Sequence, residues 1–311
     1  MARIQLRAFF FGDPAGRAMT RQPQTDKPDD TMTQRALLIN PCYPLSETPS
    51  PPLGLAYLAG ALEAAGATVE ILDLVVLPRT ADTLGDVLNR LQPDLVGVTA
   101  VTMTAENAFD IVREVKQRAP DMLTVMGGPH ATFSAAETLN RVPELDVIVR
   151  GEGEQTLLEL LDDVRRRRWK AIPGLAFRTE DGLCQTPWRR PVKDLDRLAA
   201  PARHRLPLGR YRTLGMPVSL TTSRGCPYAC IFCVGRRMVG ARVRYRRPER
   251  VVDEMEQLAA LGFRQINLAD DLFTANPRHC LAICNEIQRR GLSVRWSSFA
   301  RVDTVSTLLL S

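Results

Sequence analysis

The sequence predicts an α/β protein in which an N-terminal doubly wound parallel sheet precedes a partial (β/α) barrel. Three observations support this class. Five apolar runs alternate with segments of helical periodicity between residues 34 and 168. A second strand–helix alternation begins at residue 217. From there to Ser311 only three strand–helix units fit, whereas a generic closed (β/α) barrel uses about eight.

The first alternation defines the elements of the expected doubly wound sheet. Helix 53–65 ends at Gly66, and Thr104 is a candidate N-cap for helix 104–119. Ligands of such sheets bind in the loops that leave the carboxyl ends of the strands. The expected strands are 36–41, 68–76, 94–102, 122–128 and 145–151, and the expected helices are 53–65, 82–92, 104–119, 133–141 and 155–168.

The remaining segments divide the chain into four parts. Residues 1–33 are polar, contain prolines and lack periodicity, which predicts a disordered N-terminal segment before the sheet domain 34–168. Residues 169–216 form a connector with a hairpin around Asp181-Gly182, a strong turn signal. The partial barrel 217–311 has strands near 217–222, 265–271 and 293–302, and helices 248–261 and 277–290.

Composition limits the classes of function. The net charge of +6 comes mostly from arginines at 165–168 and 236–250. A solvated surface near anionic ligands is the favoured explanation over nucleic-acid binding, because no nucleic-acid motif accompanies the charge. No apolar run approaches the about 18 residues of a membrane span. Seven cysteines without a secretory signal favour a reducing, cytoplasmic compartment.

Three of these cysteines carry the strongest chemical signal. Cys226, Cys230 and Cys233 follow a strand-like run with the spacing C-x3-C-x2-C, so their thiolates can converge on one metal centre. Three thiolates leave one iron of a cubic 4Fe–4S cluster open to a small molecule. A zinc site that takes a fourth thiolate from Cys280 or Cys284 is the alternative. A disulfide is disfavoured, because the cysteine count is odd and the spacing is short.

The stretch SRGCPYACIFC (223–233) resembles the signature of the radical S-adenosylmethionine (SAM) superfamily. The resemblance implies that Cys226, Cys230 and Cys233 hold a 4Fe–4S cluster whose open iron binds SAM, and that the cluster delivers the electron that cleaves it. It also implies that the backbone at Phe232 faces the adenine. An electron donor such as flavodoxin or ferredoxin would be a partner, and the substrate would be a small molecule.

The region 35–165 resembles the cobalamin-binding domain that precedes the radical SAM barrel in one subgroup of these enzymes. The stretches that carry the resemblance are INPCYP, PPLGLAYLAGAL, GGPHAT and RGEGE. It implies cobalamin contacts at Thr99, Thr102, Gly127, Gly128, Gly151 and Gly153. For any single glycine, a tight βα turn is the simpler explanation. The pattern D-x-H-x-x-G, whose histidine ligates cobalt, is absent, so cobalt would lack a histidine ligand, or the domain would keep the fold without the cofactor.

The segment LADDLFTAN (268–276) resembles the second barrel strand of the same subgroup. The resemblance implies that Asp270 or Asp271 contacts the amino group or ribose of SAM, and that Arg301 pairs with its carboxylate. A salt bridge from Arg301 to Asp303 or Asp271 is an equally good explanation.

Together these resemblances predict a cobalamin-dependent radical SAM enzyme, most simply a C-methyltransferase or a related enzyme that modifies carbon skeletons. The catalytic residues and the substrate cannot be read from the sequence. The short barrel leads us to expect a C-terminally truncated enzyme, for which a non-catalytic cofactor-binding remnant is the alternative. A tRNA methylthiotransferase is disfavoured, because the first domain holds only Cys42 and not a second cysteine triad.

Overall fold

The computed structural model describes residues 33–43, 49–78, 80, 82–165 and 167–310. These residues belong to one compact unit, Thr33–Ser311. The segment 1–33 that the sequence predicts to be disordered lies outside the described residues, except for its last residue.

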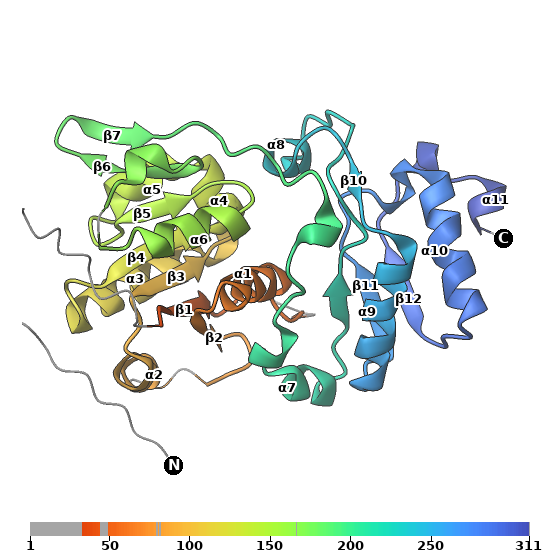
Figure 1. Ribbon diagram of the computed structural model, residues 1–311, viewed down its shortest axis with the longest axis horizontal. Helices are drawn as coiled ribbons and strands as arrows, with labels where there is room; N and C mark the ends of the chain where they lie inside the picture. Colours follow the sequence, from red (N-terminus) through yellow and green to blue (C-terminus); the bar gives the residue numbers. More distant parts are fainter. Residues whose placement is uncertain (1–32, 44–48, 79, 81, 166, 311) are drawn as a thin grey trace, which may run out of the picture. The chain divides into compact units, whose positions relative to one another are not determined.

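The first sheet has seven strands in the order β2-β1-β3-β4-β5-β6-β7. The first five are parallel, as the apolar runs predict, and β6 and β7 are antiparallel (Figure 1). Strand order reverses between β1 and β3, which is the topological switch point of a doubly wound sheet. The strands are β1 (Arg35–Asn40), β2 (Thr68–Asp73), β3 (Leu95–Thr99), β4 (Leu123–Gly127), β5 (Val147–Val149), β6 (Leu175–Thr179) and β7 (Gly182–Gln185).

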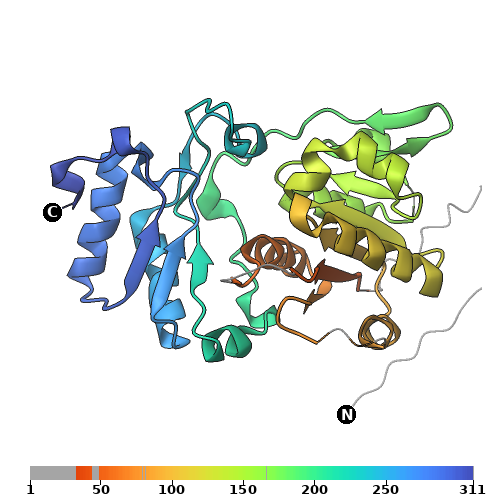
Figure 2. The same cartoon turned by 180° about the vertical axis from the view of Figure 1, so that it is seen from behind.

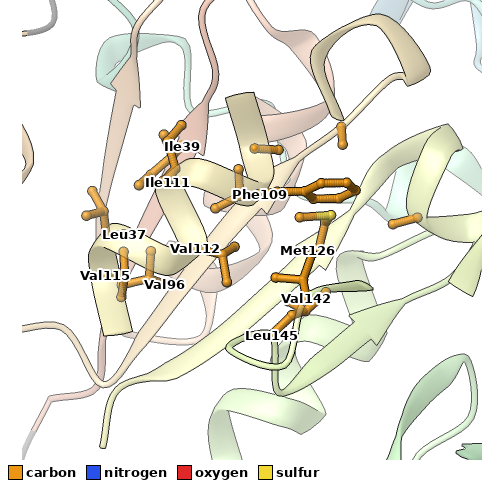
Figure 3. Close-up of a cluster of buried hydrophobic side chains, with 14 of the residues drawn as sticks. Leu37, Ile39, Val96, Phe109, Ile111, Val112, Val115, Met126, Val142 and Leu145 are labelled. Atoms are coloured by element: carbon orange, nitrogen blue, oxygen red, sulfur yellow. The ribbon is translucent and has the colours of Figure 1, made fainter. Parts of the chain in front are cut away.

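Helices cover both faces of this sheet, because successive residues of its strands point to opposite sides. In β1, Leu37 and Ile39 face one cluster, which α2 and α3 complete with Phe109 at its centre (Figure 3). Ala36 and Leu38 face the other cluster, which α1 and α6 complete. The helices are α1 (Leu53–Ala64), α2 (Thr83–Leu91), α3 (Ala105–Arg118), α4 (Gly128–Phe133), α5 (Ala135–Arg141) and α6 (Glu154–Asp162).

The connector predicted at 169–216 is partly a component of the first sheet. Its hairpin, β6 and β7, turns at Glu180 and Asp181, with Gly182 as the first residue of β7, and β6 pairs with β5 through Ile148 and Ala176. After the hairpin the chain makes short 3-10 turns and the helix α7 (Leu208–Thr213). The 3-10 turns of the described chain are η1 (Thr102–Thr104), η2 (Trp169–Ala171), η3 (Leu195–Arg197), η4 (Arg203–Arg205), η5 (Phe273–Ala275) and η6 (Val302–Thr304).

A smaller parallel sheet follows, with the order β12-β11-β8. Helices α9 and α10 pack along it around Met255 and Ile283, and the same layering is visible from behind in Figure 2. Strands β9 and β10 form a separate antiparallel pair. The elements are β8 (Val218–Leu220), β9 (Ser223–Arg224), α8 (Gly235–Val239), β10 (Arg244–Tyr245), α9 (Pro248–Ala260), β11 (Gln265–Leu268), α10 (Pro277–Arg289), β12 (Arg295–Ser298) and α11 (Thr307–Leu310).

Three local expectations were wrong. The helix expected at 155–168 ends at Asp162, and the carboxylate of Asp163 instead binds the backbone N–H and the side chain of Arg168. The helix expected at 133–141 begins earlier, as α4, and is interrupted at Ser134. Thr104 precedes α3 but does not cap it, because its hydroxyl bonds to the backbone of Val101.

No helix in the described ranges is long and apolar enough to cross a bilayer.

Candidate functional site

The main candidate site is a cavity of about 420 Å³ at the carboxyl ends of both parallel sheets. Its volume is in the range of cofactor pockets, about 300–1,000 Å³. Leu38, Thr99 and Val149 enter it from the first sheet, close to the switch point between β1 and β3. Thr221, directly after β8, and Asp271, after β11, enter it from the second sheet. A ligand in this cavity therefore contacts the ligand-binding edges of both sheets at once.

The structure brings most of the predicted cobalamin contacts together at this cavity. Thr99 and the predicted glycines line it: Gly127, Gly128, Gly151 and Gly153. Thr102 is not part of the described lining. It lies exposed in η1, with its hydroxyl 3.4 Å from Nδ1 of His130.

The backbone explains some of these glycines without a ligand. Gly128 has φ +91°, and a Cβ there would lie 2.6 Å from the carbonyl oxygen of Ala100. Its small size is therefore required by the close approach of the loop after β3. Gly54, at the start of α1, is different, because a Cβ on it would meet nothing within 4 Å although the residue lines the cavity. Open space in front of the backbone is what a bulky ligand needs.

The walls are mostly apolar side chains, including Leu53, Leu58 and Leu157. None of the described residues that line the cavity is a histidine. An open, apolar cavity with glycine at strand ends fits the broad, largely apolar faces of a corrin ring, and a cobalt held there would have no histidine ligand from the lining.

Three carboxylates line the cavity, and two of them are paired with arginine. Glu152 forms a two-pronged ion pair with Arg244, and Glu154 binds Arg224 at 2.8 Å. Burial alone lowers the pKa of Arg224, but Glu154 and then Glu152 raise it, and the net shift is upward. Arg224 therefore stays charged inside the protein.

The third carboxylate, Asp271, has a different environment. The backbone N–H of Gly225 approaches it at 3.4 Å. Burial raises its pKa above the ordinary value, and the Gly225 N–H opposes that rise. A Cβ on Gly235 would lie 2.9 Å from Oδ1 of Asp271 and 3.4 Å from Sγ of Cys233, so the glycine allows the carboxylate and the thiol to approach the same point. Asp271 thus faces both the cavity and the cysteine loop.

Its neighbour Asp270 is buried, and protein donors occupy its carboxylate. The backbone N–H and the hydroxyl of Thr222 and the hydroxyl of Ser223 each donate to it at 2.6 Å. These bonds fix the end of β11 to the chain that leaves β8. Of the two adjacent aspartates, Asp271 is therefore the one exposed to a cavity ligand.

The cysteine loop runs from Gly225 to Val234, between β9 and α8. Cys226, Cys230 and Cys233 are free thiols on it, and the side chains of Ile231 and Phe232 are 102% and 88% exposed. The N–H of Gly235 donates to Sγ of Cys233, and Nη1 of Arg301 donates to Sγ of Cys230 at 3.1 Å. Within the described part of the chain, no three His, Cys, Asp or Glu side chains converge to hold a metal ion. The donor set fits an iron–sulfur cluster by its chemistry, and ligation by these cysteines stays a prediction.

Arg301 lies at this loop with two further contacts. Its guanidinium stacks 4.0 Å from the ring centroid of Tyr228 and forms a two-pronged ion pair with Asp303. The salt bridge to Asp303 that the sequence offers as an alternative is therefore present, and it leaves Arg301 beside Cys230. Cys280, the first candidate for a fourth zinc ligand, is instead buried, where its thiol donates to the carbonyl of Phe273.

Sequence reasoning missed the residues that join the cavity to the cysteine loop. Glu152 and Glu154 stand in RGEGE, which was quoted for its glycines, and Arg224 and Arg244 belong to stretches quoted for the cysteines and for general charge. Two carboxylates beside strand-end glycines were the available signal. Their partners lie far along the chain, so spacing alone could not identify them.

Comparison with known proteins agrees with this geometry. The family model for the B12 binding domain matches residues 46–161. An uncharacterized methyltransferase of Pyrococcus horikoshii is 35% identical over 83% of this chain and 56% of its own length. An anaerobic magnesium-protoporphyrin IX monomethyl ester cyclase of Rubrivivax gelatinosus is 36% identical over 82% of this chain and 47% of its own.

Among solved structures, a radical SAM methyltransferase, TsrM, from Kitasatospora setae, with cobalamin and a 4Fe–4S cluster bound, superposes with a TM-score of 0.71. It is 27% identical, and the match covers 83% of this chain and 51% of that one. The chain thus spans about half the length of the relatives it matches.

Residues 46–161, which carry β2 to β5 and the helices of the first sheet, therefore match the B12-binding domain family, and a smaller parallel sheet follows them. Over 83% of its length the chain is homologous to a radical SAM methyltransferase that binds cobalamin.

Proposed function

We propose that this chain binds cobalamin in the cavity, holds a 4Fe–4S cluster on Cys226, Cys230 and Cys233, and binds SAM beside that cluster. The proposed reaction is C-methylation, or a related modification of the carbon skeleton, of a small-molecule substrate. One observation carries the proposal: a single cavity receives the carboxyl ends of both parallel sheets and reaches the cysteine loop through Asp271.

For cobalamin, the proposed contacts are those that line the cavity. The glycines Gly127, Gly128, Gly151 and Gly153 bring backbone to its surface, and Thr99 supplies a hydroxyl there. Thr102, exposed beyond the lining, is proposed for the nucleotide tail. Bound cobalamin would supply methyl-carrier chemistry. The chain's own apolar walls would exclude water from the reacting face.

For the cluster and SAM, the proposal uses the residues around the cysteine loop. Hydrogen bonds to sulfur, such as those from Gly235 and Arg301, tune the potential of iron–sulfur clusters. Asp271 is proposed for the amino group or ribose of SAM, with Asp270 holding the strand end behind it. Arg301 is proposed for the carboxylate of SAM and the backbone at Phe232 for its adenine. A small electron-transfer protein, flavodoxin or ferredoxin, would reduce the cluster.

The test is anaerobic reconstitution with iron and sulfide, followed by SAM and a strong reductant. We expect visible cluster absorbance, about four irons per chain, and release of 5′-deoxyadenosine. Cys230→Ala should lose both the absorbance and the product, whereas Cys42→Ala, which changes an exposed thiol far along the chain, should keep them. A protein that binds zinc and no iron would refute the proposal.

A cofactor-binding protein without turnover is the second candidate. The observation that favours it is that the cysteines do not converge in the described chain. Stoichiometric cobalamin binding without 5′-deoxyadenosine under strong reduction would support it over the enzyme.

A further inference from the structure

Four buried charged side chains connect the B12-binding domain to the strands that flank the cysteine loop. We call Glu152, Glu154, Arg224 and Arg244 the four-charge cluster. Their side chains are only 7–13% exposed. Charged groups are almost never buried to this extent unless they are paired, so the position of each depends on its partners.

Three of the four contacts within the cluster are short and charge-assisted. Oε1 and Oε2 of Glu152 accept from Nη2 and Nη1 of Arg244 at 2.7 and 3.0 Å. Oε1 of Glu154 lies 2.8 Å from Nη2 of Arg224, and Oε1 of Glu152 lies 3.5 Å from Nη1 of Arg224. Because Glu152 and Arg244 share two parallel hydrogen bonds, the pair fixes the relative orientation of the carboxylate and the guanidinium as well as their distance.

The two arginines are direct partners across the β9–β10 pair, Arg224 opposite Arg244. Like charges in directly opposed positions destabilise a strand pair. The glutamates of the B12-binding domain neutralise them, so the β9–β10 pair depends on residues 152 and 154 for its charge balance. The cysteine loop lies between these two strands, and Arg224 is two residues before Cys226.

The cluster also holds the chain on the far side of the loop. Arg244 donates to the carbonyl of Val239, at the end of α8, and to the carbonyl of Val192 in the connector, both at 2.7 Å. Glu152 in turn accepts from the N–H of Val192 at 2.9 Å. Both ends of the segment that carries the cysteines are therefore bonded to one set of charges.

Three members of the cluster, Glu152, Glu154 and Arg224, line the cavity. Arg224 additionally stacks 4.9 Å from the ring centroid of Tyr57, another lining residue. A ligand in the cavity thus touches the side chains that hold the base of the cysteine loop.

From this arrangement we propose that the four-charge cluster couples occupancy of the cavity to the position of the cysteine loop, with Glu154 and Arg224 as positioning residues. The inference rests on the proposed function in one respect, namely that cobalamin occupies the cavity. It adds that cobalamin binding and the exposure of Cys226, Cys230 and Cys233 are thermodynamically linked.

The experiment measures alkylation of the reduced, metal-free chain by iodoacetamide, peptide by peptide, with and without saturating cyanocobalamin. Equilibrium dialysis establishes the saturation. We expect the alkylation rate of at least one loop cysteine to change about fivefold, the lower end of ordinary coupling between sites. Cys42, exposed and outside the cluster, is the internal reference and should not change.

Glu154→Gln keeps the size of the side chain and removes its charge. At a cyanocobalamin concentration that equilibrium dialysis shows to saturate this variant, the change in alkylation rate should be lost. Glu106→Gln is the control. It breaks an ion pair with Arg141 at the surface, where the Glu106 side chain is 62% exposed and the Arg141 side chain 54%, and it should behave as wild type. If Glu154→Gln does not fold, Glu152→Gln provides the same comparison.

Each outcome has one meaning. Cyanocobalamin binding to wild type without any change in the loop cysteines overturns the coupling and leaves the proposed function intact. A change that persists in Glu154→Gln and Glu152→Gln also overturns it. Failure of wild type to bind cyanocobalamin overturns the proposed function, and the coupling with it.

Discussion

Replacing Tyr211 with Phe tests how α7 is fixed to the first sheet. Tyr211 is fully buried, and its hydroxyl donates to Oδ2 of Asp73 at 2.6 Å, at the carboxyl end of β2. The other carboxylate oxygen accepts from Asn40 at 2.9 Å and, over a longer distance of 3.3 Å, from the N–H of Val75. The substitution therefore removes the one bond to Oδ2 and keeps the ring.

A hydrogen bond to a charged group contributes about 1.5–3 kcal/mol, and here both partners are buried. We expect a loss of about 2 kcal/mol in the free energy of unfolding near pH 8. For a chain of this size this corresponds to a fall of about 4–8 °C in the unfolding midpoint.

The loss should depend on pH. Burial raises the pKa of Asp73 above its ordinary value of 3.8, while the Tyr211 hydroxyl opposes the rise. A carboxyl whose folded pKa is raised favours folding fully below its unfolded pKa and loses that contribution as pH rises through the folded pKa. Without the hydroxyl, the folded pKa of Asp73 rises further. The variant's deficit should therefore be smaller near pH 5 than near pH 8.

The assay is calorimetric unfolding of both proteins at the two pH values. Tyr43→Phe is the matched control, because among the described residues its hydroxyl bonds to the sulfur of Met103 at the surface. It should shift the midpoint by less than about 1 °C. A Tyr211→Phe deficit equal at both pH values, or no deficit at all, would refute the role assigned to the Asp73 carboxylate.

Two further predictions concern packing and SAM binding. Gly60→Ala should lower the free energy of unfolding by about 2 kcal/mol or more, because its Cβ would lie 2.1 Å from the carbonyl oxygen of Ala200. Gly54→Ala is the control, because its Cβ would meet open space. It should leave the free energy unchanged in the same denaturant titration. Asp271→Asn should weaken SAM binding to the reconstituted protein about tenfold or more, as expected for loss of a charge-assisted contact. Isothermal titration with SAM measures the affinity, and equal SAM affinity for wild type and variant would remove Asp271 from the proposed site.

The strands were predictable because each signal was local. Five apolar runs separated by helical periodicity gave the parallel strands, and parallel strands place their carboxyl ends at one edge. That rule alone brings Thr99 and Gly151 to the same cavity. The pairing of β6 with β5 was not predicted, since a hairpin signal says nothing about which sheet the hairpin joins.

The charge pairing was beyond the reach of sequence patterns. Glu152 and Arg244 are 92 residues apart, and a run of arginines looks the same whether its members are solvated or buried. The sequence also could not distinguish Asp270 from Asp271, because the two residues are adjacent and chemically identical and differ only in their burial. Only the positions of Thr222 and Ser223 show that the first carboxylate is occupied.

Cobalamin binding by the cavity is the central claim, and equilibrium dialysis of the purified chain against hydroxocobalamin tests it most directly. Wild type should bind one cobalamin per chain. Gly54→Trp, which fills open space in front of the cavity lining, should fold normally and lose that binding. No binding by wild type, or equal binding by both proteins, would contradict the placement of the cofactor in this cavity.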